Sequence, residues 1–277
     1  MSSSLRPLTT GQLLDKAFQT YRQNFVLFVG ISAVPQACLL VMQLCLLAVG
    51  VGGAGRGQVK VALATLIVSL FTIFVSLVVG SIAAAATTFG VSDIYLDKPT
   101  SISACFARVK GKIGKVIYAS TAFGLRVGFG FMLLIVPGVY WAGKYGLAVP
   151  AVVLEDIEGK QACSRSAELT KDSVGRIIAI YFLTWILVVA ISAGLGAALG
   201  VTAPGLARAT GTTGSTVFKY LVSYLVNTIV TPVMAIALTL AYYDQRVRKE
   251  AFDIESMMSL LGEPTAAKTE NTMGATS

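Results

Sequence analysis

Two cations interrupt long apolar runs and are the residues best suited to chemistry inside a membrane. Arg126 lies near the middle of the run 116–136, and Lys144 lies in the run 139–154. An arginine at the centre of a bilayer costs about 3 kcal/mol or more, so it should face a partner, a cavity or the helix bundle. If both cations face inward, they form a positive site suited to a phosphate or a carboxylate.

A second interpretation of these cations needs no ligand. The span could be shifted so that Arg126 reaches the interface or binds backbone carbonyls. Lys144 has aromatic neighbours typical of an interfacial belt and could extend past them to the membrane surface. The sequence leaves both interpretations open.

Carboxylates that could act as acids or bases stand beside basic residues. Glu155 is followed by Arg165, and Asp244 is close to Arg246 and Arg248. Paired carboxylates can serve in acid–base catalysis. Beside so many cations at a helix boundary, however, they favour ion pairs that cap helices. We interpret these five residues as a boundary cluster at the cytoplasmic surface and predict no catalytic residue.

Metal and cofactor motifs are missing from the sequence. The chain has no histidine, and its four cysteines show no Cys-x-x-Cys spacing. Short-spaced cysteine and histidine pairs are the usual zinc ligands, so no metal site is predicted. We expect no cofactor and no enzymatic activity.

The composition indicates a membrane protein. Of 277 residues, 55% are hydrophobic and only 13% are charged, whereas soluble domains carry about 25% charged residues. Lipid as the solvent explains this deficit. The net charge of +8 comes from basic residues that flank apolar runs, which the positive-inside rule explains better than nucleic-acid binding.

The apolar runs predict an all-α integral membrane protein with about six transmembrane helices arranged as three hairpins. A bilayer core of about 30 Å needs roughly 20 apolar residues in a helix. The fourth run is short, but it fits as the return arm of a hairpin that turns at Pro137-Gly138. The predicted spans are 25–51, 61–86, 116–136, 139–154, 177–200 and 217–243.

These spans form a single membrane domain, 1–261, followed by a polar tail, 262–277, that we expect to be disordered. Most of the 22 lysines and arginines fall on one side of this arrangement. The positive-inside rule therefore predicts a multi-pass protein of the bacterial inner membrane with the N-terminus, the C-terminus and the tail in the cytoplasm.

Short amphipathic helices are expected at the cytoplasmic interface, where their basic residues would meet lipid headgroups. Thr9 and Gln12 have the spacing of a capping box that opens the first of them. The glycines of Gly124-x-x-x-Gly128 predict a close helix crossing. The apolar faces of the three stretches are Leu13, Leu14, Ala17, Phe18 and Tyr21; Ile102, Cys105, Phe106, Val109 and Ile113; and Ala162, Ser166 and Leu169.

Several stretches resemble the glycerophosphoryl diester phosphodiesterase membrane-domain family, and the resemblance extends to about Leu261. The most specific stretch is 242–253, Tyr-Tyr-Asp-Gln-Arg-Val-Arg-Lys-Glu-Ala-Phe-Asp. The others are Leu5-Arg6-Pro7-Leu8, Phe18 to Phe25, Pro137-Gly138-Val139-Tyr140, Pro150, Glu155, Ala162, Arg165-Ser166 and Leu169-Thr170-Lys171. The resemblance implies the membrane part alone, because the family's barrel enzyme uses histidines and needs about 250 residues. It implies no phosphodiesterase activity here.

Two functions follow as hypotheses. The first is a non-enzymatic scaffold or accessory protein of the membrane. The alternative is a small transporter or a lipid- or anion-handling protein that uses Arg126 and Lys144. A wet central cavity lined by both cations would favour transport, and a solid bundle with its cations at the rims would favour a scaffold. The expected partners are membrane lipids with anionic headgroups at the cytoplasmic face, with a protein partner or a second copy of the chain left open.

Overall fold

The computed structural model describes residues 9–51, 58–198 and 203–261, and within these ranges every regular element is an α-helix. The predicted all-α fold is therefore confirmed, whereas the predicted tail lies outside the described residues. The helices are α1 (Thr10–Gln23), α2 (Phe25–Val51), α3 (Gln58–Tyr95), α4 (Ile102–Lys110), α5 (Ile113–Leu133), α6 (Ile135–Tyr145), α7 (Ala148–Glu155), α8 (Gly159–Thr170), α9 (Val174–Ala198) and α10 (Ala203–Leu261).

Five of the described helices are long and apolar enough to cross a membrane. The qualifying segments are Phe25–Ala48 of α2, Leu66–Tyr95 of α3, Ile113–Leu133 of α5, Val174–Gly194 of α9 and Thr213–Lys249 of α10. Large apolar side chains along α3 stand exposed, including Leu66, Ile67, Leu70, Phe71 and Phe74. Lipid is the solvent in which such a surface is stable, so the chain is a polytopic membrane protein.

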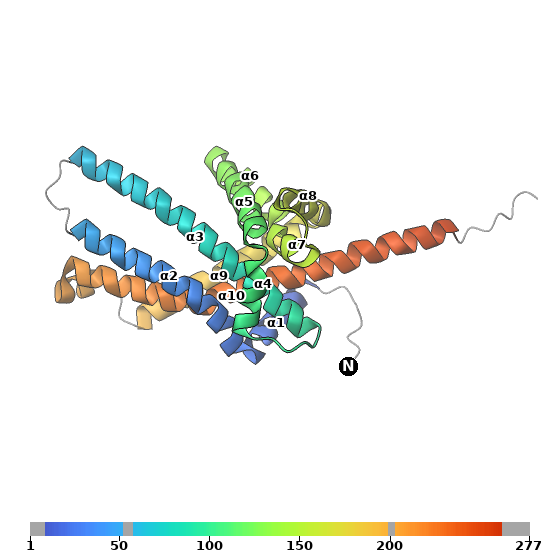
Figure 1. Ribbon diagram of the computed structural model, residues 1–277, viewed down its shortest axis with the longest axis horizontal. Coiled ribbons are helices and arrows are strands. Elements are labelled where there is room, and N and C mark those ends of the chain that lie inside the picture. Colours follow the sequence, from blue (N-terminus) through green and yellow to red (C-terminus); the bar gives the residue numbers. More distant parts are fainter. Residues whose placement is uncertain (1–8, 52–57, 199–202, 262–277) are drawn as a thin grey trace, which may run out of the picture.

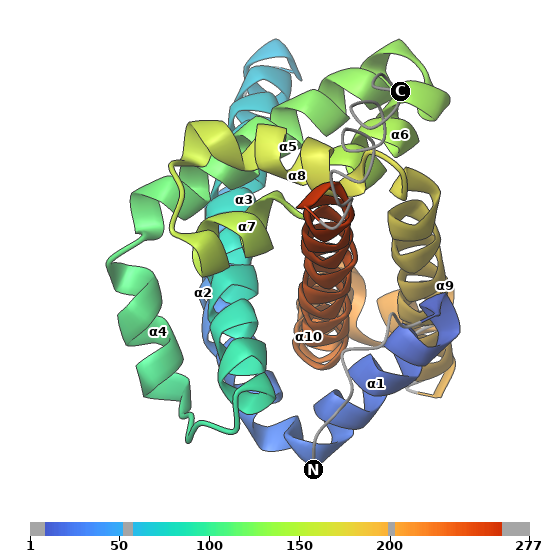
Figure 2. The same ribbon diagram turned by 90° about the vertical axis from the view of Figure 1, so that its right-hand side faces the viewer.

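Helix α10 is the centre of the structure. In Figure 2, which looks along it, the other helices surround it, and it packs against α1, α2, α3 and α9. Pro232 lies inside α10 and cannot donate to the carbonyl one turn earlier. Close to this proline, the Tyr21 hydroxyl from α1 donates to the carbonyl oxygen of Ile229 at 2.6 Å. Helix α1 is thus attached to α10 within one turn of the proline.

The short helices α1, α4 and α8 bury the apolar faces that the sequence predicts for them. Leu13 and Tyr21 of α1 join a core around α10, and Cys105 and Val109 of α4 join a second core with α3, α5 and α7. The capping box that opens α1 is formed, with the Gln12 amide donating to the Thr9 hydroxyl at 3.3 Å. In Figure 2 these three helices lie around α10, with α1 below it, α4 to the left and α8 above it.

The turn of the hairpin between α5 and α6 differs from the expectation. It lies at Leu134, where φ is −165° and ψ is 157°, and Pro137 and Gly138 belong to the first turn of α6. A proline is tolerated there because the first amides of a helix have no partner within the helix. The glycine that brings the two arms together is Gly130, packed on Gly138, whereas Gly128 faces open space.

The predicted span 139–154 is two helices. Helix α6 ends at Tyr145 and α7 begins at Ala148, so neither reaches the length of a bilayer crossing. The break has a local cause, because Pro150 cannot donate to the carbonyl of Gly146 in a continuous helix. As the third residue of α7 it occupies a position that needs no donor.

Helix α8 supplies hydrogen bonds at this break. The Ser166 hydroxyl accepts the Leu147 amide at 3.1 Å and donates to the Lys144 carbonyl oxygen at 3.0 Å. The Thr170 hydroxyl lies 2.9 Å from the same carbonyl oxygen. All of these polar groups are buried or half-buried, so α8 satisfies backbone atoms that would otherwise be costly to bury.

Candidate functional site

Arg126 and Lys144 come from the two arms of the α5–α6 hairpin and meet at one aromatic ring. The guanidinium carbon of Arg126 lies 5.4 Å from the centroid of the Tyr145 ring, and the Lys144 ammonium lies 5.7 Å from it. Both distances are within the range of cation–π attraction. We refer to these three residues as the cation pair and its ring.

The other contacts of the two cations are with neutral groups. Arg126 donates to the Ala122 carbonyl oxygen at 3.0 Å and to the Cys163 sulfur of α8 at 3.4 Å, and Lys144 also lies over the ring of Tyr140. Within the part of the chain that the structure describes, neither cation forms an ion pair with a carboxylate. The pair therefore carries two positive charges, which suits an anion.

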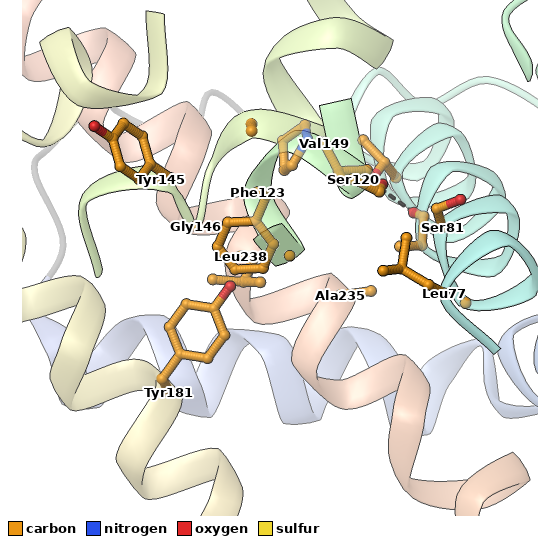
Figure 3. A pocket seen from close by; sticks show the side chains of 16 residues that line it. Leu77, Ser81, Ser120, Phe123, Tyr145, Gly146, Val149, Tyr181, Ala235 and Leu238 are labelled. Atoms are coloured by element: carbon orange, nitrogen blue, oxygen red, sulfur yellow. Dashed lines mark hydrogen bonds between the residues drawn. The ribbon is translucent and has the colours of Figure 1, made fainter. Parts of the chain in front are cut away.

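Tyr145 also lines a cavity of about 290 Å³. Side chains from α3, α5, α6, α7, α9 and α10 enclose it, and most of them are apolar (Figure 3). Neither Arg126 nor Lys144 lines this cavity, but Tyr145 does. The arrangement thus places a positive site and an apolar space beside the same ring.

The cavity wall also carries buried hydroxyl groups. Ser120 of α5 lines it, and its oxygen is buried without a hydrogen-bond partner among the described residues. In Figure 3 the ring of Tyr181 extends from α9 toward the cavity with its hydroxyl leading. A buried polar atom without a partner is uncommon in folded proteins, and a bound molecule is one way to satisfy it.

Glu155 and Arg165, which the sequence places in one boundary cluster, form a two-pronged ion pair between α7 and α8. Arg165 donates from Nε and Nη2 to the two Glu155 oxygens, each at 2.9 Å. Tyr242 of α10 donates to Glu155 as well. Burial opposes ionisation of Glu155, but the bonds from Arg165 and Tyr242 and the nearby charge of Arg246 outweigh it, and the pKa of the carboxyl lies below its usual value.

Asp244 forms the second centre of this cluster. Its side chain is only 4% exposed, and its Oδ2 accepts Arg176 of α9 at 2.6 Å and Arg248 at 2.8 Å. Next to it, the Ser173 hydroxyl donates to the Gln245 side chain at 2.9 Å. The pairing of Asp244 with Arg248 follows from their spacing of four residues on one helix, but the pairing with Arg176 joins α10 to α9 and has no local signal. We call the ion pairs of Glu155 and Asp244 the charged layer.

Two further acidic residues, Asp93 and Asp156, form ion pairs with cations that the sequence does not indicate as their partners. Asp93, near the end of α3, accepts Arg108 of α4 at 2.6 Å, and the same guanidinium lies 4.2 Å from the ring centroid of Phe89. Asp156 accepts Lys115 at 3.0 Å and Lys112 at 3.1 Å. In the sequence, the one indication of the Asp93 ion pair is an acid at the end of an apolar run. An acid buried there needs a nearby cation.

Comparisons with models of protein families, with curated proteins and with solved structures find no match to this chain. The resemblance to the glycerophosphoryl diester phosphodiesterase membrane-domain family therefore remains an expectation. The cation pair, the cavity and the charged layer are the features of this chain that indicate a function.

The charged layer makes stability dependent on pH. Because the pKa of Glu155 is lowered in the folded protein, its ion pair stabilises the fold fully above the usual carboxyl pKa and is lost as the pH falls through the lowered value. We expect the thermal midpoint of the wild type to fall between about pH 6 and pH 3.5 more steeply than that of Glu155→Gln. Parallel slopes for the two proteins, measured by circular dichroism in a mild detergent, would contradict this.

Proposed function

We propose that this membrane protein binds an anionic lipid and holds its phosphate at Arg126 and Lys144. The observation that carries the proposal is the meeting of these two cations at Tyr145 without a carboxylate ion pair in the described part of the chain. A phosphate oxygen is a strong acceptor for both ammonium and guanidinium donors. It would neutralise two charges that are otherwise expensive to hold against lipid.

The adjoining cavity supports a lipid as the source of that phosphate. At about 290 Å³ and with mostly apolar walls, it suits part of an acyl chain better than a hydrated ion. Because Tyr145 both lines the cavity and lies beside the two cations, a headgroup at the cations and a chain in the cavity would belong to one molecule. Ser120 would then meet a polar atom of the lipid near the glycerol.

These features favour lipid handling over ion transport. The cavity is apolar and the cations stand outside it, so it does not resemble a wet path through the bundle. A scaffold role would need no such cavity. We place the charged layer at the cytoplasmic face of a bacterial inner membrane, with both termini on that side, because the basic residues concentrate there in the sequence.

Native mass spectrometry of the gently extracted protein tests the proposal. After incubation with vesicles of phosphatidylglycerol and phosphatidylethanolamine, the wild type should retain phosphatidylglycerol. The double variant Arg126→Leu with Lys144→Leu should retain about tenfold less, because each charge-assisted bond contributes at least about 1 kcal/mol.

The matched control removes two exposed cations elsewhere. Lys110→Leu with Lys160→Leu lowers the net charge equally and leaves Tyr145 untouched, so it should retain lipid like the wild type. Equal losses in both double variants would show a surface-charge effect and refute the site. Retention of phosphatidylethanolamine at the same level as phosphatidylglycerol would refute anion selectivity. Thermal midpoints within a few degrees of the wild type establish that each variant is folded.

A further inference from the structure

The hairpin of α5 and α6 ends in a turn without a polar side chain. Residues 131–136 read Phe-Met-Leu-Leu-Ile-Val, and every one of them is exposed, with Met132 at 86% and Val136 at 78%. A loop that emerges into water on the far side of a membrane is normally polar. Each of these side chains would cost about 1.5–3 kcal/mol to expose to water. The tip of the hairpin is therefore suited to the hydrocarbon core of a membrane.

The first half of α5 has a different environment. Helix α8 lies along it, with Gly159 so close to Lys115 that a Cβ atom would stand 2.7 Å from the Lys115 carbonyl oxygen, and with Cys163 at Arg126. The outer face of α8 is polar, with exposed residues Lys160, Gln161, Ser164 and Glu168. Such a face belongs to the headgroup region or to water, so the part of α5 from Lys115 to Arg126 lies there as well.

The arms beyond the cation pair are short. From Arg126 to the turn at Leu134 there are eight residues, about 12 Å of helix, and from Lys144 back to Ile135 there are nine, about 14 Å. A bilayer core is about 30 Å thick, so one leaflet is about 15 Å. Figure 1 shows the hairpin steeply inclined to α10, which makes these lengths upper limits for its depth.

We propose that α5 and α6 form a re-entrant hairpin that enters and leaves one leaflet on the side of the charged layer. Its apolar tip rests among the acyl chains of that leaflet, and Arg126 and Lys144 lie at the level of the phosphates. The chain then crosses the membrane four times, through α2, α3, α9 and α10, and its termini remain on one side. This topology follows from the positions of α8 and the tip and does not depend on retention of a particular lipid.

The alternative is a complete crossing by α5, which its length and composition alone allow. In that arrangement Arg126, thirteen residues into the helix, would lie about 20 Å from the start of α5 and past the centre of the bilayer. Helix α8 would follow it there through the Cys163 contact, together with the exposed Lys160 and Ser164. The polar face of α8 would be costly to bury at that depth, which argues against a complete crossing by α5.

Spin labels along the hairpin distinguish the two topologies. We would replace the four native cysteines with alanine, introduce Leu125→Cys, Phe129→Cys or Leu134→Cys, and reconstitute each labelled protein in phosphatidylglycerol–phosphatidylethanolamine vesicles. All three positions are exposed in the structure. The ratio of collisions with oxygen to collisions with a water-soluble nickel chelate reports depth.

The re-entrant hairpin predicts a ratio that rises in the order 125, 129, 134, with the tip deepest. A crossing helix predicts the opposite order, because its centre lies near residue 125 and its tip approaches the far surface. Leu70→Cys on the exposed face of α3 and Gly111→Cys in the exposed connection between α4 and α5 calibrate lipid and water. Any order other than the rise toward 134 overturns the proposal. The labels at positions 70 and 111 also report folding. If the cysteine-free protein were unfolded, the two labels would give the same collision ratio.

Discussion

Replacing Asp244 with alanine is expected to lower the free energy of unfolding by about 3 kcal/mol or more. The Asp244 carboxylate is buried and accepts two guanidinium groups, one from α9 and one from its own helix. Arg176 is itself only 15% exposed. Without Asp244, Arg176 loses the carboxylate that neutralises it in a setting where water cannot replace that charge.

Unfolding by titration with sodium dodecyl sulfate from mild-detergent micelles would measure this loss. Asp172→Ala is the matched control, because Asp172 is 81% exposed and stands 3.5 Å from Lys249. An exposed pair of this kind contributes about 1 kcal/mol at most. Equal destabilisation by the two variants would mean that the charged layer does not hold α9 against α10. Asp244→Asn should fall between the two, since the amide oxygen still accepts one hydrogen bond.

The sequence predicts the long helices well because each needs one simple property, an apolar run of bilayer length. The run 25–51 coincides with α2. The other runs predict where lipid contacts the helix rather than where the helix ends. Helix α3 therefore continues past residue 86 to Tyr95 through buried polar residues such as Asp93, and α10 continues past residue 243 into a charged segment.

The depth of the α5–α6 hairpin in the membrane is harder to predict from the sequence, because it depends on contacts between distant segments. Composition alone predicts that an apolar run of this length crosses the membrane. Helix α8 packs on α5, however, and its polar face limits how much of α5 can lie in hydrocarbon. Its contacts with Lys115, Arg126 and Lys144 join segments that are distant in the sequence. The break at Leu147 had a readable signal in Pro150, whereas the hydroxyl of Ser166 that completes it could not be assigned without the fold.

For the candidate site too, the sequence predicts some features, whereas others depend on tertiary packing. Arg126 and Lys144 stand out in the sequence because charge is rare in apolar runs, and the structure brings them together at one ring. In the sequence, their shared contact Tyr145 is only one of the aromatic neighbours of Lys144 that suit an interfacial belt. The cavity beside it forms from six helices, and its position depends on packing that no local pattern encodes. Residue type therefore predicts candidate chemistry, and tertiary packing determines which candidates meet.

Replacing Gly130 with alanine is expected to destabilise the protein by about 1–3 kcal/mol through the α5–α6 hairpin. A Cβ atom at this position would stand 2.8 Å from the Cα of Gly138, 2.8 Å from the Trp141 ring and 3.0 Å from the Gly138 nitrogen. Two of these three atoms are backbone and cannot rotate away. The arms of the hairpin would have to separate, and the cation pair would separate with them.

Gly128→Ala provides a control on the same helix, because nothing lies within 4 Å of the added methyl group. It should leave stability unchanged or raise it by up to about 1 kcal/mol, since alanine favours a helix over glycine. Titration with sodium dodecyl sulfate compares the two variants. If the close contact at Gly130 positions Arg126 against Lys144, Gly130→Ala should also lose phosphatidylglycerol although both cations remain. Retention of lipid by a destabilised Gly130→Ala would show that the cations bind independently of the hairpin's packing.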